Sequence, residues 1–264
     1  MIHKTAIIDK DAKISDNVNI GPYCVVGPKV EIGEGTELHS HVNLVGNTKI
    51  GKNNIIYPFA SIGTPPQDLK YTGEDNSLII GDGNKFREYV NINPGTSAGG
   101  TITRLGNYNL LMVYCHVAHD CNLGDNIVLA NNVQVGGHVT IEDSAIIGGS
   151  CAIHQFSRIG KLAMVGGMTG VLSDVIPFGL SIGNRNNLAG LNLIGLRRAK
   201  ISNEDIKILQ NFYNIVFSNQ NFRSNIDKLQ KNLKENKYVK TIIDFINSDK
   251  KRPISLPINK NENN

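Results

Sequence analysis

Four histidines in the middle of the chain are the side chains best suited to acid–base chemistry. His116, His119, His138 and His154 fall inside a segment of 39 residues. An imidazole changes its charge near neutral pH, so it can take a proton from a hydroxyl group. Three imidazoles can also bind zinc. Because a single surface histidine usually has no special role, the elements that carry these four decide whether they form a site.

The element that carries them is a repeat of six residues. A helix would show apolar residues at a spacing near 3.6, and an ordinary strand would alternate, so neither explains this period. A six-residue period is typical of a parallel β-helix, in which short strands and turns stack around one interior column. The inward positions run from Ile8 to Ile62, continue in phase at Ile80, Phe86 and Ile92, and run again from Leu105 to Val171.

The repeat predicts that several of these polar residues are neighbours. None of the four histidines occupies an inward position, so all four should lie outside the core. If three hexads form one coil, residues three hexads apart lie one above the other. Gly137 then lies one coil above His119, and His138 lies one coil above Asp120. These residues should form a compact polar patch.

Two interruptions and a change of pattern define the organisation of the chain. The interruptions are rich in Gly, Pro and Thr, as loops are, and loops on a rigid scaffold commonly carry function. After Val171 the repeat fades into three predicted amphipathic helices, the first capped by Ser202. We therefore predict a mainly β chain: a hexapeptide-repeat β-helix over 1–190, with loop excursions near 63–79 and 93–104, and a C-terminal α-helical domain over 191–264.

The predicted helices have clear apolar stripes. Residues 253–264 have no such stripe and resemble a frayed polar tail. The stripes are Ile206, Leu209, Phe212 and Val216 in the first helix, Ile226, Leu229 and Leu233 in the second, and Val239, Ile242, Ile243 and Ile246 in the third.

Composition limits the partners and the compartment. The formal net charge is +4, but from Arg197 onward the chain has 14 Lys and Arg and 7 Asp and Glu, an excess of positive charge that favours an acidic macromolecular partner.

The cysteines lack metal-ligand or redox spacing, and neither a signal region nor a long apolar stretch occurs. These features favour a cytoplasmic protein without a membrane span. The basic residues are not interleaved with aromatic ones, so we expect no nucleic-acid binding.

Longer motifs are more specific than the repeat. The segment LLMVYCHVAHDCNLGDNIVLANNVQVGGHV, followed by CAIHQF and MVGGMTGV, resembles the UDP-N-acetylglucosamine O-acyltransferase family of lipid A biosynthesis. PPQDLKYTGED and GLNLIGLRRAK are similar to it too, so the resemblance covers essentially the whole chain. It implies a left-handed β-helix and a homotrimer. The implied reaction transfers an (R)-3-hydroxyacyl chain from acyl carrier protein to the 3-hydroxyl of UDP-N-acetylglucosamine.

The resemblance also implies roles for individual residues. His119 matches the general base, Asp120 a residue that orients it, and Gly137 the backbone N–H that stabilises an oxyanion. Gln67 matches a position near the pantetheine arm of the donor, and Gly167 the floor of the groove for the acyl chain. The matched substrate-binding positions are Asp68, Lys70, His116, His138, His154, Gln155, Asn192 and Arg198.

The donor brings its own prosthetic group, so the resemblance implies no further cofactor. The phosphopantetheine arrives with acyl carrier protein, and the basic C-terminal helices would dock this acidic partner.

Three alternatives stay open at this point. A UDP-2,3-diamino sugar as acceptor would give an amide, although Asp68 in its usual place favours the hydroxyl acceptor. Zinc-binding relatives with hexapeptide repeats separate two histidines by four residues, whereas only two residues separate His116 from His119. A non-catalytic scaffold that binds carrier protein would leave the histidine patch unexplained.

Overall fold

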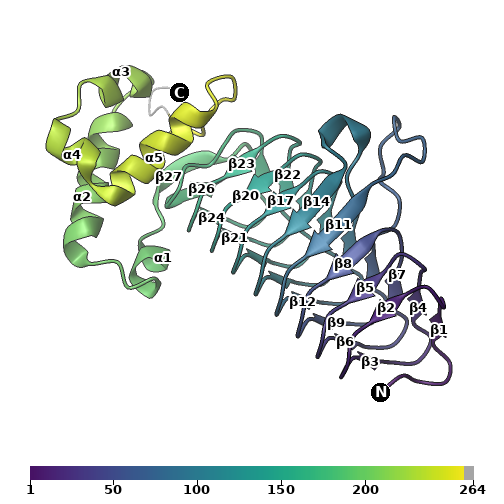
Figure 1. Cartoon of the computed structure of the whole chain (residues 1–264). Helices are drawn as coiled ribbons and strands as arrows, with labels where there is room; N and C mark the ends of the chain where they lie inside the picture. The colour runs from purple at the N-terminus through teal and green to yellow at the C-terminus, as the bar shows by residue number, and fades with distance from the viewer. Residues whose placement is uncertain (259–264) are drawn as a thin grey trace.

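The computed structural model describes residues 1–258 as a long column with a helical region at one end (Figure 1). The column consists of short parallel strands, and each strand pairs with the strands one coil below and above it. Val117 pairs with Val135, and Val135 pairs with Ile153. A regular coil therefore contains three hexads, as the period predicts.

The strands form three sheets, which are the faces of the column. The first sheet contains β1 Ile7–Ile8, β4 Val25–Val26, β7 Asn43–Leu44, β10 Ser61–Ile62, β13 Asn91–Ile92, β16 His116–Val117, β19 Gln134–Val135, β22 Ala152–Ile153 and β25 Gly170–Val171. The second sheet contains β2 Lys13–Ile14, β5 Glu31–Ile32, β8 Thr48–Ile50, β11 Ser77–Ile80, β14 Ile102–Leu105, β17 Asn122–Leu123, β20 Thr140–Ile141 and β23 Arg158–Ile159. The third sheet contains β3 Asn19–Ile20, β6 Glu37–Leu38, β9 Ile55–Ile56, β12 Lys85–Phe86, β15 Leu110–Leu111, β18 Val128–Leu129, β21 Ile146–Ile147, β24 Met164–Val165, β26 Gly179–Ile182 and β27 Asn187–Leu191.

The sixth positions fill the interior of the column. Ile62, Phe86, Val117 and Leu129 are fully buried there in one continuous apolar cluster. Burying each such side chain stabilises the fold by roughly 1.5–3 kcal/mol. The four cysteines are buried and form no disulfide.

Both interruptions leave the column at the same corner, where the first sheet passes into the second. We call it the loop corner. The first loop joins β10 to β11, and the second joins β13 to β14 and contains the short 3-10 helix η1 Ser97–Gly99. Both loops are shorter than predicted, because β11 begins at Ser77 and β14 at Ile102. Figure 1 shows them projecting together from the column.

The C-terminal region has its own apolar core. It begins at Ile176, directly after the last residue of the column cluster, Val175. The antiparallel pair of β26 and β27 leads into the helices α1 Leu193–Arg198, α2 Asn203–Val216, α3 Phe222–Asp227, α4 Lys231–Glu235 and α5 Lys237–Ser248. The domain boundary between residues 190 and 191 stays a prediction.

The helices differ in part from the prediction. The first predicted stripe is buried in α2, and the hydroxyl of Ser202 caps this helix by accepting from the Asp205 N–H at 3.1 Å. The third stripe lies on α5. The second predicted helix is wrong, because the extended backbone of Gln230 (φ −61°, ψ 145°) divides that stripe between α3 and α4. The sequence analysis also did not predict α1 as a helix.

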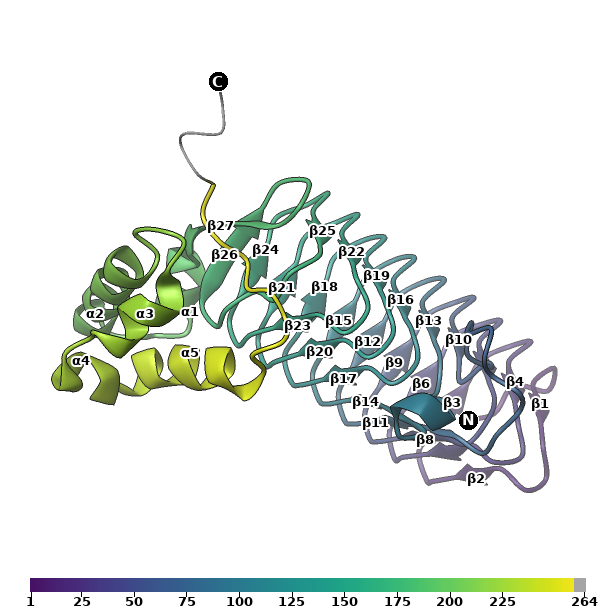
Figure 2. The same ribbon diagram turned by 90° about the horizontal axis from the view of Figure 1, so that it is seen from above.

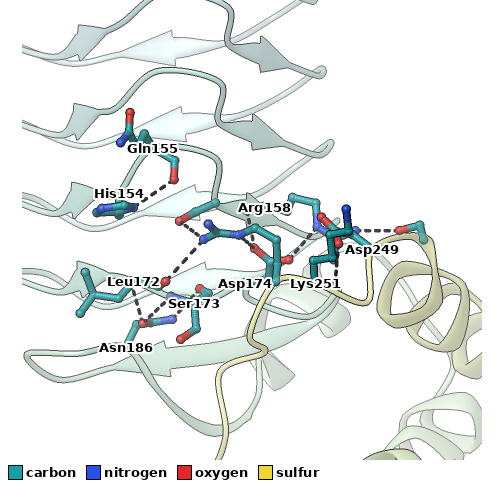
Figure 3. Close-up of polar contacts among 12 residues, drawn as sticks. His154, Gln155, Arg158, Leu172, Ser173, Asp174, Asn186, Asp249 and Lys251 are labelled. Atoms are coloured by element: carbon teal, nitrogen blue, oxygen red, sulfur yellow. Dashed lines mark hydrogen bonds and ion pairs between the residues drawn. The ribbon is translucent and has the colours of Figure 1, made fainter. Parts of the chain in front are cut away.

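The predicted frayed tail is wrong for its first residues. The chain returns to the end of the column, where Ile254 forms a parallel bridge with Asp174 and is buried (Figure 2). The fully buried carboxylate of Asp174 contacts the guanidinium group of Arg158 at 2.7 Å (Figure 3). It also contacts the guanidinium group of Arg252 at 3.3 Å. These contacts attach the C-terminal segment to the column. Residues 259–264 of the predicted tail lie outside the described residues.

No helix among residues 1–258 is long and apolar enough to cross a lipid bilayer.

Candidate active site

The predicted polar patch lies at the loop corner, on successive coils. His119 and Asp120 form the turn between β16 and β17, and Gly137 and His138 form the turn between β19 and β20. The second residue of each turn has a left-handed backbone, with φ 59° at Asp120 and 60° at His138. Coil stacking supports this conformation, since the His138 N–H donates to the His119 carbonyl at 3.0 Å. The four residues meet as the repeat predicts.

His119 and Asp120 form a hydrogen-bonded pair. Nδ1 of His119 lies 2.8 Å from Oδ2 of Asp120, whose side chain is 1 % exposed. An ionised carboxylate only accepts hydrogen bonds, so Nδ1 carries the proton and Nε2 keeps its lone pair in the neutral ring. Nε2 lies 4.0 Å from Oδ2 of Asp68. This is the arrangement of a general base that a buried carboxylate orients.

Gly137 lies against the ring of His119. A Cβ atom at this position would lie 2.6 Å from Cε1 of His119, so a larger residue would displace the base. Proline occupies the equivalent position of this corner at Pro28, in the turn between β4 and β5, which shows that coil stacking needs no N–H there. Within residues 1–258 the Gly137 N–H donates no hydrogen bond. It is therefore available to a developing oxyanion.

The first loop closes a cleft of about 510 Å³ beside this patch. Its own turn is held by Asp68, whose Oδ1 accepts from the Lys70 N–H at 3.0 Å. Five further predicted residues therefore share one cleft with His119. The lining residues are Gln67, Asp68, Leu69, Lys70, Ala98, His119, His138, Gln155 and Phe156.

The two loops are tied to each other. Oε1 of Glu74 accepts from the Ser97 N–H at 3.1 Å, and Oε2 accepts from the Thr72 N–H at 2.9 Å. These two donors, Ser97 first, lower the pKa of Glu74 to about 2, so this carboxylate is ionised at neutral pH. Asn76 adds a hydrogen bond from Nδ2 to the Gly95 carbonyl at 2.9 Å. The loop that carries Asp68 is thereby held against the second loop.

Burial keeps two further histidines neutral. It lowers the pKa of His138, although the nearby Asp120 carboxylate opposes this shift. It also lowers the pKa of His116, and the neighbouring His119 adds to that shift. His138 stacks on Phe156 with ring centroids 4.3 Å apart, and Nδ1 of His116 lies 2.7 Å from Oδ1 of Asn91. Neutral imidazoles in fixed orientations are suited to hydrogen bonds with sugar hydroxyls.

Several predicted residues lie outside the cleft. His116 lies on the first sheet below Gln134, and His154 is exposed, with Nδ1 3.0 Å from the Gln155 carbonyl (Figure 3). Gly167 lies at a different corner, where the third sheet passes into the first. A single chain therefore does not join Gly167 to His119 in one cavity.

Asn192 and Arg198 lie at the two ends of α1. Oδ1 of Asn192 caps this helix by accepting from the Gly195 N–H at 3.0 Å, and Nδ2 donates to the Leu162 carbonyl at 2.9 Å. The amide thus has a structural role that the sequence analysis did not anticipate. Arg198, the last residue of α1, is exposed.

Thr96 and Phe156 also contact the patch, although neither was predicted from the sequence. Thr96, in the second loop, donates to both oxygens of Asp120: its N–H to Oδ1 at 2.9 Å and its hydroxyl to Oδ2 at 2.6 Å. The sequence feature that could have indicated Thr96 is the pair of glycines around it, Gly95 and Gly99, in a loop already expected to carry function. Phe156 follows His138 by three hexads, so its stacking contact was readable from the repeat.

His119, Asp120 and His138 also have the residue types of a metal site. Their ligand atoms lie within 4.8 Å of one another. However, both oxygens of Asp120 already accept short hydrogen bonds, and Nδ1 of His138 lies 3.9 Å from Oδ2. Hydrogen bonding accounts for this arrangement.

The fold and the cleft together define a hexapeptide-repeat transferase with an acid–base pair at one corner of its column. Residues 11–46 match the family model of the bacterial transferase hexapeptide (six repeats). Residues 174–255 match the model of UDP N-acetylglucosamine O-acyltransferase, domain 2. The chain belongs to the UDP-N-acetylglucosamine O-acyltransferase family.

Relatives are similar over nearly their whole length. The acyl-[acyl-carrier-protein]–UDP-N-acetylglucosamine O-acyltransferase of Aliarcobacter butzleri (strain RM4018) is 46 % identical over 259 residues, which is 98 % of each chain. Its counterpart in Thermodesulfovibrio yellowstonii is 47 % identical over 251 residues, 95 % of this chain and 97 % of that protein.

Solved structures agree with the fold. UDP-N-acetylglucosamine O-acyltransferase (LpxA) from Moraxella catarrhalis RH4 has a TM-score of 0.92 and 47 % identity, covering 96 % of this chain and 98 % of that one. LpxA from Acinetobacter baumannii has a TM-score of 0.92 and 41 % identity over 97 % and 99 %. The fold is the left-handed parallel β-helix of hexapeptide repeats, followed by a C-terminal helical region.

Proposed function

We propose that this protein transfers an (R)-3-hydroxyacyl chain from acyl carrier protein to the 3-hydroxyl of UDP-N-acetylglucosamine, the first step of lipid A biosynthesis. The observation that carries the proposal is the His119–Asp120 pair: His119 lines the cleft, Asp120 leaves its Nε2 free, and Gly137 lies against the imidazole ring. The names of the relatives supply the donor and the acceptor.

The chemistry follows from this geometry. Nε2 of His119 takes the proton of the sugar 3-hydroxyl as its oxygen attacks the thioester carbonyl. The Gly137 N–H donates to the oxyanion that forms, and the buried Asp120 carboxylate stabilises the imidazolium. When the intermediate collapses, the carbon–sulfur bond breaks and His119 returns the proton to the phosphopantetheine thiolate. The products are the ester and free carrier protein.

The other cleft residues bind the substrates in this scheme. Asp68 and His138 offer an acceptor and a neutral imidazole to the sugar, and Gln155 lies on the coil above Gly137. Lys70 supplies a positive charge for phosphate. Gln67 lies in the same cleft, where we assign it to the pantetheine arm.

Residues outside the cleft of one chain require a second chain. We propose a homotrimer in which Asn192, Arg198 and Gly167 contribute to sites shared between neighbouring columns, with His116 and His154 at their margins. The reaction needs no cofactor besides the phosphopantetheine of the donor, and we place the protein in the cytoplasm.

His119→Ala tests the assignment of the base. We expect the rate of transfer from (R)-3-hydroxyacyl carrier protein to fall by about 10²- to 10⁴-fold, because the hydroxyl loses its proton acceptor. His39→Ala is the matched control, since His39 is exposed and lies outside the cleft. Mass spectrometry of the acylated nucleotide measures the product.

The result separates three outcomes. Full activity in His119→Ala would remove His119 from the role of base. If the wild type acylates only a UDP-2,3-diamino sugar, the acceptor is wrong while the base assignment can still hold. If the wild type binds acyl carrier protein but transfers no acyl chain to either sugar, the protein is a scaffold.

A further inference from the structure

The Asp120 carboxylate is enclosed by the second loop. Besides His119, it contacts Thr96, which supplies one backbone and one hydroxyl donor at 2.9 and 2.6 Å. Thr103 accepts the Asp120 N–H through its hydroxyl oxygen at 2.8 Å and so holds the backbone of the same residue. Thr96 and Thr103 are both buried. The carboxylate is almost completely shielded from solvent, since the Asp120 side chain is 1 % exposed.

The glycines of this loop allow the close approach. A Cβ atom on Gly95 would lie 2.7 Å from Oδ1 of Asp120, and one on Gly99 would collide with the carboxylate carbon. Larger residues at either position would therefore displace the carboxylate or the loop. Gly99 therefore allows the loop to approach the carboxylate, and Gly95 allows both this approach and the close packing of the loop on the backbone of Thr101 and Ile102.

We propose that Thr96 is a positioning residue for His119 that acts through Asp120. The proposal rests on the proposed role of His119 as general base. The Thr96 hydroxyl and N–H hold the two carboxylate oxygens in place, so that Oδ2 fixes the imidazole with its proton on Nδ1 and its lone pair on Nε2. The loop insertion at 93–101 thereby contributes to the reaction without touching the substrate.

Thr96 also controls how strongly Asp120 favours the protonated imidazole. A hydrogen bond donated to Oδ2 partly neutralises the negative charge of the carboxylate, so the carboxylate stabilises the protonated imidazole of His119 less. Without the hydroxyl, the carboxylate would stabilise the imidazolium more and hold the ring in a less defined orientation. Both changes weaken a base that must be neutral at the start of each turnover.

Other charged or titratable groups surround His119, and a substitution at Thr96 leaves them in place. Asp68 and Lys70 come from the first loop, and His116 and His138 come from the coils of the column. Among the charged groups of residues 1–258, the Asp120 carboxylate is the one that hydrogen-bonds to Thr96. A change at Thr96 therefore reaches the imidazole through Asp120.

Thr96→Val removes the hydroxyl and keeps the side-chain shape and the backbone N–H. We expect kcat to fall by about ten- to hundred-fold, the range for losing a hydrogen bond to a charged group, with little change in KM for the sugar nucleotide. The acid limb of the kcat/KM profile should move to higher pH. Thr96→Ser should restore both rate and profile. Thr101→Val is the matched control, because its hydroxyl contacts only the Gly100 carbonyl of the same loop.

A second measurement does not depend on turnover. In 15N-histidine-labelled protein, the ring signals missing from His119→Ala identify His119, and a pH titration follows its charge. We expect the midpoint of this titration to rise in Thr96→Val and to stay at the wild-type value in Thr101→Val.

The two measurements decide the proposal. Wild-type rate and titration in Thr96→Val would overturn it, as would a slow variant whose titration midpoint and acid limb are unchanged, since that pattern indicates a structural role alone. If the wild type does not acylate UDP-N-acetylglucosamine, the proposed function fails, and the histidine titration still decides whether Thr96 controls His119.

Discussion

At the scale of single residues, burial controls the charge of two histidines that flank the base. It lowers the pKa of His116 and His138 from the ordinary value of 6.5. In the unfolded chain both rings take up a proton as the pH falls through about 6.5, whereas in the folded chain they resist it. The unfolded state then binds more protons, so the free energy of unfolding should fall below that pH.

His116→Gln isolates one of these groups. The amide of Gln can still donate to Oδ1 of Asn91, but it does not titrate. We expect the free energy of unfolding to drop less between about pH 7.5 and pH 5.5 in the variant than in the wild type. Urea denaturation at both pH values measures this, with exposed His39→Gln as the control. Equal drops in wild type and His116→Gln would contradict the assignment.

At the scale of elements, each corner of the column presents a different surface. The loop corner carries the acid–base pair, while the next corner carries a stretch of bare backbone at Gly149 and Gly167. A Cβ atom on Gly167 would lie 3.3 Å from the Gly149 carbonyl oxygen. Among residues 1–258, Gly149 is the only residue besides the two chain neighbours of Gly167 with an atom within 4 Å of that Cβ. This exposed surface is consistent with the floor of a groove for a long acyl chain.

Gly167→Met should therefore shorten the preferred acyl chain. We expect the rate with long 3-hydroxyacyl donors to fall by about ten-fold or more, because a new side chain would occupy the end of the groove, while short donors keep their rate. A series of carrier proteins with different acyl chains measures the preference. Lys161→Met places the same side chain on the same coil at another corner and should leave the chain-length preference unchanged. An unchanged preference in Gly167→Met would remove Gly167 from the groove floor.

At the scale of the whole molecule, the candidate residues are divided between places that one chain does not join. The cleft contains His119, whereas Arg198 ends α1 in the helical region beyond the column. A convex column has no deep cavity that spans both. The proposed homotrimer would bring such residues together, since the same pair of surfaces would meet at every interface around its symmetry axis.

Mixing two defective chains tests this arrangement. When His119→Ala and Arg198→Ala chains are co-expressed in equal amounts and assemble at random, about one quarter of all trimer interfaces should combine an intact His119 with an intact Arg198 from the neighbour. We expect activity near that fraction of wild type, far above either variant alone. Activity equal to the average of the two variants would place both residues in one chain's site. Sedimentation of the mixed protein gives the oligomeric state.

The six-residue period was sufficient to predict the column and the centre of the site. Each coil hydrogen-bonds to the next in register, so the chain position of a residue determines its corner and its neighbours above and below. His119 under Gly137, and Asp120 under His138, follow directly from that register. The family motifs then indicated the residues of the first loop that share the cleft.

Contacts that do not follow the period were decided only by the tertiary structure. Thr96 reaches Asp120 because the second loop folds back over the corner, and no repeat dictates the path of a loop. The break at Gln230, the cap formed by Asn192 and the return of Ile254 to Asp174 likewise depend on packing between segments far apart in the chain. A periodic backbone carries its geometry in the sequence, whereas loops and termini take theirs from the surfaces on which they pack.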